Sequence, residues 1–173
     1  MIDPTRPNHS VTRPPPGRAR RALLLAPLAW PLAAQGHGPA GHRPAGPAEQ
    51  QAWGIAGEPR AVRRTVDVTM HDTMRFTPDR LRVAFDETLR LRVRNAGRVM
   101  HELVIGDRAA LDEHAELMVR FPNMAHDEPW MAHVEPGATG TLVWRFNRRG
   151  TFHFACLIAG HYSAGMIGRI DVV

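Results

Sequence analysis

The segment Cys156–Met166 reads CLIAGHYSAGM and gives the clearest chemical signal in the sequence. It contains a thiol at Cys156, an imidazole at His161 and a thioether at Met166, with four residues between successive members. Cys156 is the only cysteine in the 173 residues, so an intramolecular disulfide is excluded and the thiol needs another use. A second imidazole, His101, lies just after an Asn-Ala-Gly turn sequence much earlier in the chain.

This combination of donor atoms indicates a mononuclear copper site. Thiolate and thioether sulfur suit Cu(I), whereas imidazole suits both oxidation states of copper. Two histidines, one cysteine and one weakly bound methionine form the trigonal sites with a long axial ligand that transfer electrons. Zinc prefers nitrogen and thiolate ligands without methionine, so Met166 argues against a structural zinc site.

From about Arg60 onward, apolar residues alternate with polar ones, as in strands that bury one face. The sets predicted to point inward are Val66, Val68 and Met70; Leu81, Val83 and Phe85; Leu89, Leu91 and Val93; Leu142, Trp144 and Phe146; and Phe152, Phe154 and Cys156. Further strands are expected over about residues 99–105 and 167–173, and Asp107 is expected to cap a short helix over about residues 108–119. Residues 121–133 are predicted to be irregular. About seven to eight short strands with one helix predict an all-β sandwich.

The order and spacing of these ligand types resemble those of the cupredoxins, the small blue or green copper proteins. The resemblance covers residues from about Arg60 to Val173 and is strongest to the periplasmic CopI-like cupredoxins tied to copper tolerance. It implies a cupredoxin-like Greek-key β-sandwich that holds one type 1 copper ion. The ligands that it implies are His101, Cys156, His161 and Met166.

Four other histidines compete with His101 for the upstream ligand position: His114, His126, His133 and His153. His101 fits the family pattern because it follows the Asn95–Gly97 turn and begins a predicted strand. Glu102 departs from that pattern, since azurin-like and plastocyanin-like members often carry asparagine after this histidine. A different group beside the ligands changes the colour and potential expected of the site.

A second group of soft donors lies outside the four predicted ligands. Its members are Met100, Met118, Met124, His126, Met131 and His133. Methionine with histidine suits copper, and a weak second copper site is one interpretation. The other, which we favour, is a methionine-rich lid that packs over the core.

The sequence before the predicted domain reads as an export signal and a linker. Arg18–Arg21 precede the short apolar stretch Ala22–Ala34, so we expect residues 1–34 to be an extension and signal peptide, cleaved after Ala34. Arg20 and Arg21 fit a twin-arginine signal and an ordinary secretory one equally well. Residues 35–59 are rich in Gly, Pro and Ala and are predicted to be a flexible linker before a domain over 60–173. We expect a periplasmic protein with no stable membrane insertion after cleavage.

The charge distribution argues against nucleic-acid binding. The net charge of +5 comes mostly from the first 34 residues, because the 17 arginines that follow nearly balance 16 acidic residues. We expect a monomer.

We expect a binding protein rather than an enzyme. Multicopper oxidases and copper nitrite reductases use histidines that flank the cysteine, whereas Cys156 lies between Ala155 and Leu157. A dinuclear centre of the terminal-oxidase type needs two cysteines, and the chain has one. The resemblance implies copper tolerance through binding and redox cycling of copper, and an electron shuttle between periplasmic respiratory partners would use the same ligands. The small, apolar ligand loop beside His161 suits docking of a periplasmic redox partner or simple loop packing, and both stay open.

Overall fold

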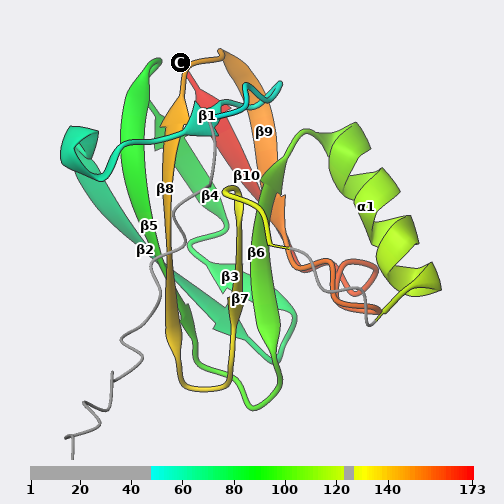
Figure 1. Ribbon diagram of the computed structural model, residues 1–173. Helices are drawn as coiled ribbons and strands as arrows, with labels where there is room; N and C mark the ends of the chain where they lie inside the picture. Colours follow the sequence, from blue (N-terminus) through cyan, green and yellow to red (C-terminus); the bar gives the residue numbers. More distant parts are fainter. Residues whose placement is uncertain (1–47, 123–126) are drawn as a thin grey trace, which may run out of the picture. The chain divides into compact units, whose positions relative to one another are not determined.

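The computed structural model describes residues 48–122 and 127–173, which form a sandwich of two five-stranded sheets with one α-helix (Figure 1). The first sheet has the order β1 (Ile55–Ala56), β8 (Thr139–Phe146), β5 (Glu87–Asn95), β2 (Arg64–His71) and β3 (Arg75–Thr77). The second has the order β4 (Arg80–Val83), β10 (Ile167–Val172), β9 (Gly150–Ala155), β6 (His101–Gly106) and β7 (Met131–Val134). Each sheet contains one parallel pair, β2 with β5 and β4 with β10, and the other pairs are antiparallel. The predicted all-β sandwich is confirmed.

The alternation of apolar and polar residues explains how the two sheets share one core. On β5, Leu89, Leu91 and Val93 are fully buried, while the arginines between them lie on the opposite face. Trp144 of β8 pairs with Leu89 and is fully buried as well. Full burial of such a side chain contributes roughly 1.5–3 kcal/mol, so the facing apolar sets hold the sandwich together.

The predicted helix is present as α1 (Arg108–Arg120). The Asp107 side chain accepts a hydrogen bond from the Ala110 N–H at 2.8 Å, which is the expected N-terminal cap. Leu111 and Met118 are buried on one face of the helix, which packs beside β6 and β9 (Figure 1). Within residues 48–122 and 127–173, no helix is long and apolar enough to cross a membrane.

Two local predictions about strands differ from the structure. Phe85 was expected to point inward, but it is 46% exposed because β4 ends at Val83 and the following turn interrupts the alternation. Its ring lies under the Arg149 guanidinium instead, at 4.6 Å. The segment predicted to be irregular contains β7, which pairs with β6.

The last part of the predicted linker packs on the domain. Trp53 is 8% exposed and joins the core, where its ring contacts that of Trp130 edge-on with centroids 5.8 Å apart. Its carbonyl accepts a hydrogen bond from Trp144 Nε1 at 3.1 Å, and β1 adds two residues to the edge of β8. The Gly/Pro/Ala-rich composition of residues 35–59 gave no indication that Trp53 would be buried in the core. Residues 1–34, predicted to be a signal, and residues 35–47 lie outside the described residues.

Candidate metal centre

The ligand loop, residues 157–165, is fixed at both ends by neighbouring strands. Cys156 directly follows β9 and Met166 directly precedes β10, and the Cys156 N–H donates to the Met166 carbonyl at 3.1 Å. The Met166 N–H in turn donates to the His161 carbonyl at 3.1 Å, which closes the loop. His101 is the first residue of β6, the other neighbour of β9 in the sheet. The sheet order therefore brings His101 to the loop.

Three of the four predicted ligands form a close cluster. Cys156 Sγ lies 3.2 Å from His161 Nδ1 and 4.0 Å from His101 Nδ1. The three ligand atoms lie within 4.8 Å of one another, and the two imidazole centroids are 4.9 Å apart. Met166 is fully buried in the same core cluster as Cys156, whereas His161 is only half-buried. His161 is therefore the member through which solvent reaches the site.

Burial favours the neutral forms of two members of the cluster. It raises the pKa of the Cys156 thiol to about 12 and lowers the pKa of His161, with a further lowering by His101. A bound metal cation would displace the thiol proton, because the thiolate is the form that ligates a metal. Thiolate, two imidazoles and a buried thioether form a soft donor set, and this set fits copper.

Asp72 orients His101 from outside the cluster. Its Oδ1 lies 3.2 Å from His101 Nε2, and its two oxygens also accept the Arg98 N–H. A Cβ on Gly97 would lie 1.9 Å from Asp72 Oδ1, so glycine is needed in this turn to make room for the carboxylate. Asp72 could not be predicted from the sequence, because an isolated aspartate after a strand carries no signal of its own.

Side chains from α1 and β3 hold the rest of the ligand loop. The Tyr162 hydroxyl donates to Asp112 Oδ1 at 2.6 Å, and the Arg108 guanidinium both pairs with Asp112 at 3.1 Å and lies 5.7 Å from the Tyr162 ring centre. On the other side, Arg75 Nη1 donates to the Ala164 carbonyl at 2.9 Å. The loop is therefore braced by residues that the sequence analysis did not assign to the site.

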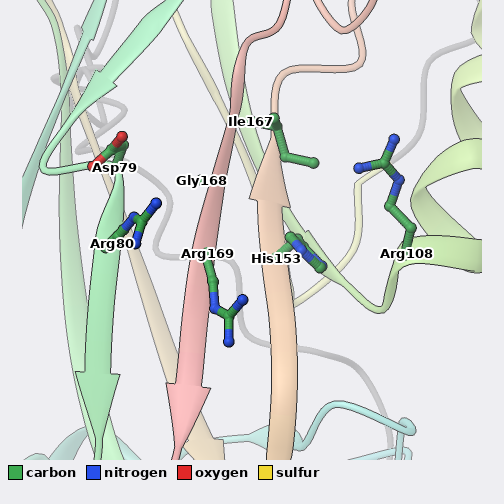
Figure 2. Close-up of a pocket in the computed structure, with 7 residues that line it drawn as sticks. All are labelled: Asp79, Arg80, Arg108, His153, Ile167, Gly168 and Arg169. Carbon is green, nitrogen blue, oxygen red and sulfur yellow. The ribbon is translucent and has the colours of Figure 1, made fainter.

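The competing histidines in the described residues lie apart from the cluster. His153 lines a groove on the outer face of the second sheet, between Arg169 of β10 and Arg108 of α1 (Figure 2). His133 lies 2.9 Å from Glu102 Oε2 through its Nε2. His114 lies on α1 and belongs to no metal-binding group among the described residues, and His126 lies outside them.

Two methionines of the second soft group pack in the protein core. Met118 and Met131 are both buried in one apolar cluster with Leu157, between α1 and the second sheet. This is the packing expected of a lid, whereas Met100 is exposed. Met124 and His126 lie outside the described residues, so the second copper site stays a prediction.

Comparison with known proteins identifies the family. No family model matches the chain. The copper-resistant cuproprotein CopI of Rubrivivax gelatinosus is 45% identical over 120 residues, which cover 69% of this chain and 73% of that protein. The chain belongs to the CopI family. CopI of Pseudomonas aeruginosa, also named a copper-resistant cuproprotein, is 31% identical over 74% of this chain and 86% of its own length.

The fold of this CopI-family chain is that of the cupredoxins. Auracyanin from the photosynthetic bacterium Roseiflexus castenholzii matches with a TM-score of 0.56 and 19% identity, over 65% of this chain and 98% of its own. At this identity the match concerns the fold alone. The resemblance to CopI-like cupredoxins is confirmed by the sequence relatives and the fold together.

Proposed function

We propose that this protein binds one type 1 copper ion at His101, Cys156, His161 and Met166 and acts in copper tolerance. The observation that carries the proposal is the placement of Cys156 Sγ within 3.2 Å and 4.0 Å of two imidazole nitrogens. One imidazole comes from the same loop and the other from a strand that begins 55 residues earlier, so the folded sandwich creates the site. The names of the CopI relatives support copper tolerance as the role.

The residues of the chain hold the ion and limit its rearrangement. Bound copper supplies reversible one-electron chemistry between Cu(I) and Cu(II). Cys156, His101 and Met166 are buried among strand residues, and the loop is braced by Tyr162 and Arg75, so the ligands keep similar positions in both states. Half-buried His161 leaves one edge for the arrival of the ion or an electron.

The same geometry supports a binding protein rather than an enzyme. Ala155 and Leu157, on either side of Cys156, are buried in the apolar cluster under α1. They offer no donor that could couple the site to another copper. Among the described residues, the only group with several metal-binding side chains is His101, Cys156 and His161.

A second candidate function is electron transfer with a periplasmic redox partner. Val99 and Met100, directly before His101, are 45% and 41% exposed and offer an apolar contact surface on the approach to the site. In the copper-tolerance role the protein would capture periplasmic copper, and oxidation of Cu(I) to the less permeant Cu(II) would pass one electron to an external electron acceptor. In a shuttle it passes electrons between respiratory proteins and keeps its copper.

Growth of a deletion strain decides between these roles. We expect the strain to grow poorly in high copper, to recover with the wild-type gene, and not to recover with Cys156→Ser. Normal growth in copper together with loss of a respiratory activity would favour the shuttle. In the purified protein, Cys156→Ser should abolish the intense thiolate-to-copper absorption band, and a mutant that keeps this band would disprove the ligand assignment.

We also propose export to the periplasm with removal of residues up to about Ala34. An unpaired thiol in an oxidising compartment is open to oxidation, and ligation inside the sandwich protects Cys156. Mass spectrometry of the protein from the native envelope fraction tests this. A full-length chain recovered from the cytoplasm contradicts it.

A further inference from the structure

Glu102 is a fully buried acidic side chain beside the metal centre, and the proposed ligand set does not use it. Its Oε1 accepts the backbone N–H of Leu157 at 2.8 Å. Its Oε2 lies 2.9 Å from Nε2 of His133, directly opposite on β7. Its own backbone N–H donates to Cys156 Sγ at 3.4 Å. One residue thus connects β6, β7 and the start of the ligand loop.

Packing alone does not account for a carboxylate at this position. Removing a carboxylate from water is costly, and an apolar side chain of similar volume usually serves a core at least as well. Here the two oxygens have different partners: one fixes the peptide that follows Cys156, and the other faces an imidazole on the neighbouring strand. His133 is one-third exposed, so the carboxylate is held from its solvent side.

The charge of Glu102 also lies close to the ligands. Its carboxylate accepts from the peptide that follows Cys156, and its own backbone N–H donates to the Cys156 sulfur. A negative charge this close to the site attracts the higher charge of Cu(II) more strongly than that of Cu(I).

We propose that Glu102 is the positioning residue of this site: it locks the Cys156–Leu157 peptide against β6, with His133 as its anchor, and its charge biases bound copper toward Cu(II). The first half concerns the metal-free protein. The second half rests on the proposed function, because it needs copper at the site. Amides that surround the cysteine sulfur tune such sites, and groups beside the ligands fix their geometry.

The first test measures amide hydrogen exchange by NMR in the metal-free protein. Glu102→Met fills a similar volume without an acceptor, while Glu102→Gln keeps an acceptor and removes the charge. We expect Leu157 to exchange about 10- to 100-fold faster in Glu102→Met, because a hydrogen bond to a charged acceptor is lost. In Glu102→Gln the rate should stay within about threefold of wild type, because the amide oxygen replaces the carboxylate. The Leu91 amide in β5 reports global unfolding in the same spectra.

The second test measures the reduction potential of the copper-loaded proteins. Both Glu102 variants should have a higher potential than wild type, because the charge that favours Cu(II) is gone. The control, Glu113→Gln, removes an exposed acid from α1 and should leave both the potential and the Leu157 exchange unchanged. A residue that only supported the fold would change stability without raising the potential of Glu102→Gln.

Two results would overturn the inference. One is wild-type exchange of Leu157 in Glu102→Met, and the other is a potential of Glu102→Gln that equals or falls below that of the control. Failure of the proposed function can be distinguished from these results. In that case the wild-type protein would show no intense copper band, but the Leu157 exchange rates in the metal-free proteins would still test the first half of the inference. If Glu102→Met does not fold, the potential of Glu102→Gln decides alone.

Discussion

Asp72 Oδ1 lies 3.2 Å from His101 Nε2, and the aspartate is partly exposed whereas the imidazole is completely buried. A carboxylate only accepts hydrogen bonds, so in the neutral imidazole Nε2 carries the hydrogen and Nδ1 keeps its lone pair. That nitrogen is the one that faces Cys156 Sγ at 4.0 Å. The contact therefore selects the tautomer of His101 that can bind a metal.

Removal of the Asp72 carboxylate should weaken copper binding. We expect Asp72→Ala to lower copper affinity about 10- to 100-fold, the usual effect of losing the partner of a metal-binding histidine. The intense absorption band should remain, because the thiolate is unchanged. Competition with a chromophoric copper chelator measures the affinity, and Asp79→Ala, an exposed acid on the outer face of the second sheet, is the matched control.

Gly97 provides an independent check of the same contact. An added methyl group would collide with Asp72 Oδ1 and Cγ, at 1.9 Å and 2.7 Å, so Gly97→Ala should displace the carboxylate and weaken binding as well. In the Asp72→Ala background both collisions are removed and only Asn95 Oδ1, at 3.2 Å, remains close, so the extra methyl group should lower copper affinity less than it does in wild type. If the effects of Gly97→Ala and Asp72→Ala on copper affinity simply add, Gly97 does not act through its contact with Asp72.

Replacement of the predicted axial ligand should change the potential more than the colour. Met166→Leu conserves the volume of a fully buried side chain, so the fold should tolerate it at a cost below about 1.5 kcal/mol. The absorption band should persist and the reduction potential should rise, because a weak donor to Cu(II) is lost. Cyclic voltammetry on the copper-loaded variant measures this. A lower potential, or loss of the band, contradicts the axial role.

The alternation of residues was sufficient to predict most of this fold. The resemblance to the cupredoxins predicted that His101, Cys156 and His161 come together, as they do in the structure. Trp144 and Phe154 were assigned inward from period two alone, and both are fully buried. Trp53 was missed because one apolar residue in a Gly/Pro/Ala-rich stretch gives no periodicity. Asp72 and Glu102 act through contacts across strands, and such contacts depend on register that local sequence does not encode.

Two histidines should give the metal-free protein opposite responses to pH. Hydrogen bonding to Glu102, with the charge of Asp127, raises the pKa of His133 above 6.5, so its stabilisation is complete below that pH and is lost as pH rises through the raised value. His133→Gln should therefore cost about 1–2 kcal/mol at pH 5.5 and less at pH 9. Urea denaturation at the two pH values measures the difference.

His153 is the matched control for that experiment. Burial, with the charges of Arg108 and Arg169, lowers its pKa, so the wild-type protein loses stability as pH falls through the lowered value. His153→Gln removes the group that causes this loss. The free energy of unfolding of the variant, relative to that of wild type, should therefore rise as pH is lowered. Parallel pH responses of His133→Gln and His153→Gln would refute the assignment of the two environments.

Loss of Trp53 should destabilise the domain although it lies far from the ligand loop in sequence. We expect Trp53→Ala to cost about 3–5 kcal/mol, as for other buried large aromatic side chains. Chemical denaturation of the metal-free protein measures it, with Trp130 and Trp144 fluorescence as the reporter. A cost below about 1 kcal/mol would mean that residues 48–56 only rest on the surface.

The parallel pairing of β4 with β10 gives the protein a high contact order. Ile170 lies opposite Leu81, and the strand that holds Met166 in place is therefore completed only when distant parts of the chain have met. Such topologies fold slowly, because the chain loses the entropy of loop closure before the long-range contacts that stabilise the fold can form. Until then Cys156 is an unprotected thiol on an unfolded chain, with no preformed site near it. The timing of metal acquisition is consequently set by the folding rate of the sandwich, and a slow-folding variant would lose copper occupancy to thiol oxidation even with every ligand intact.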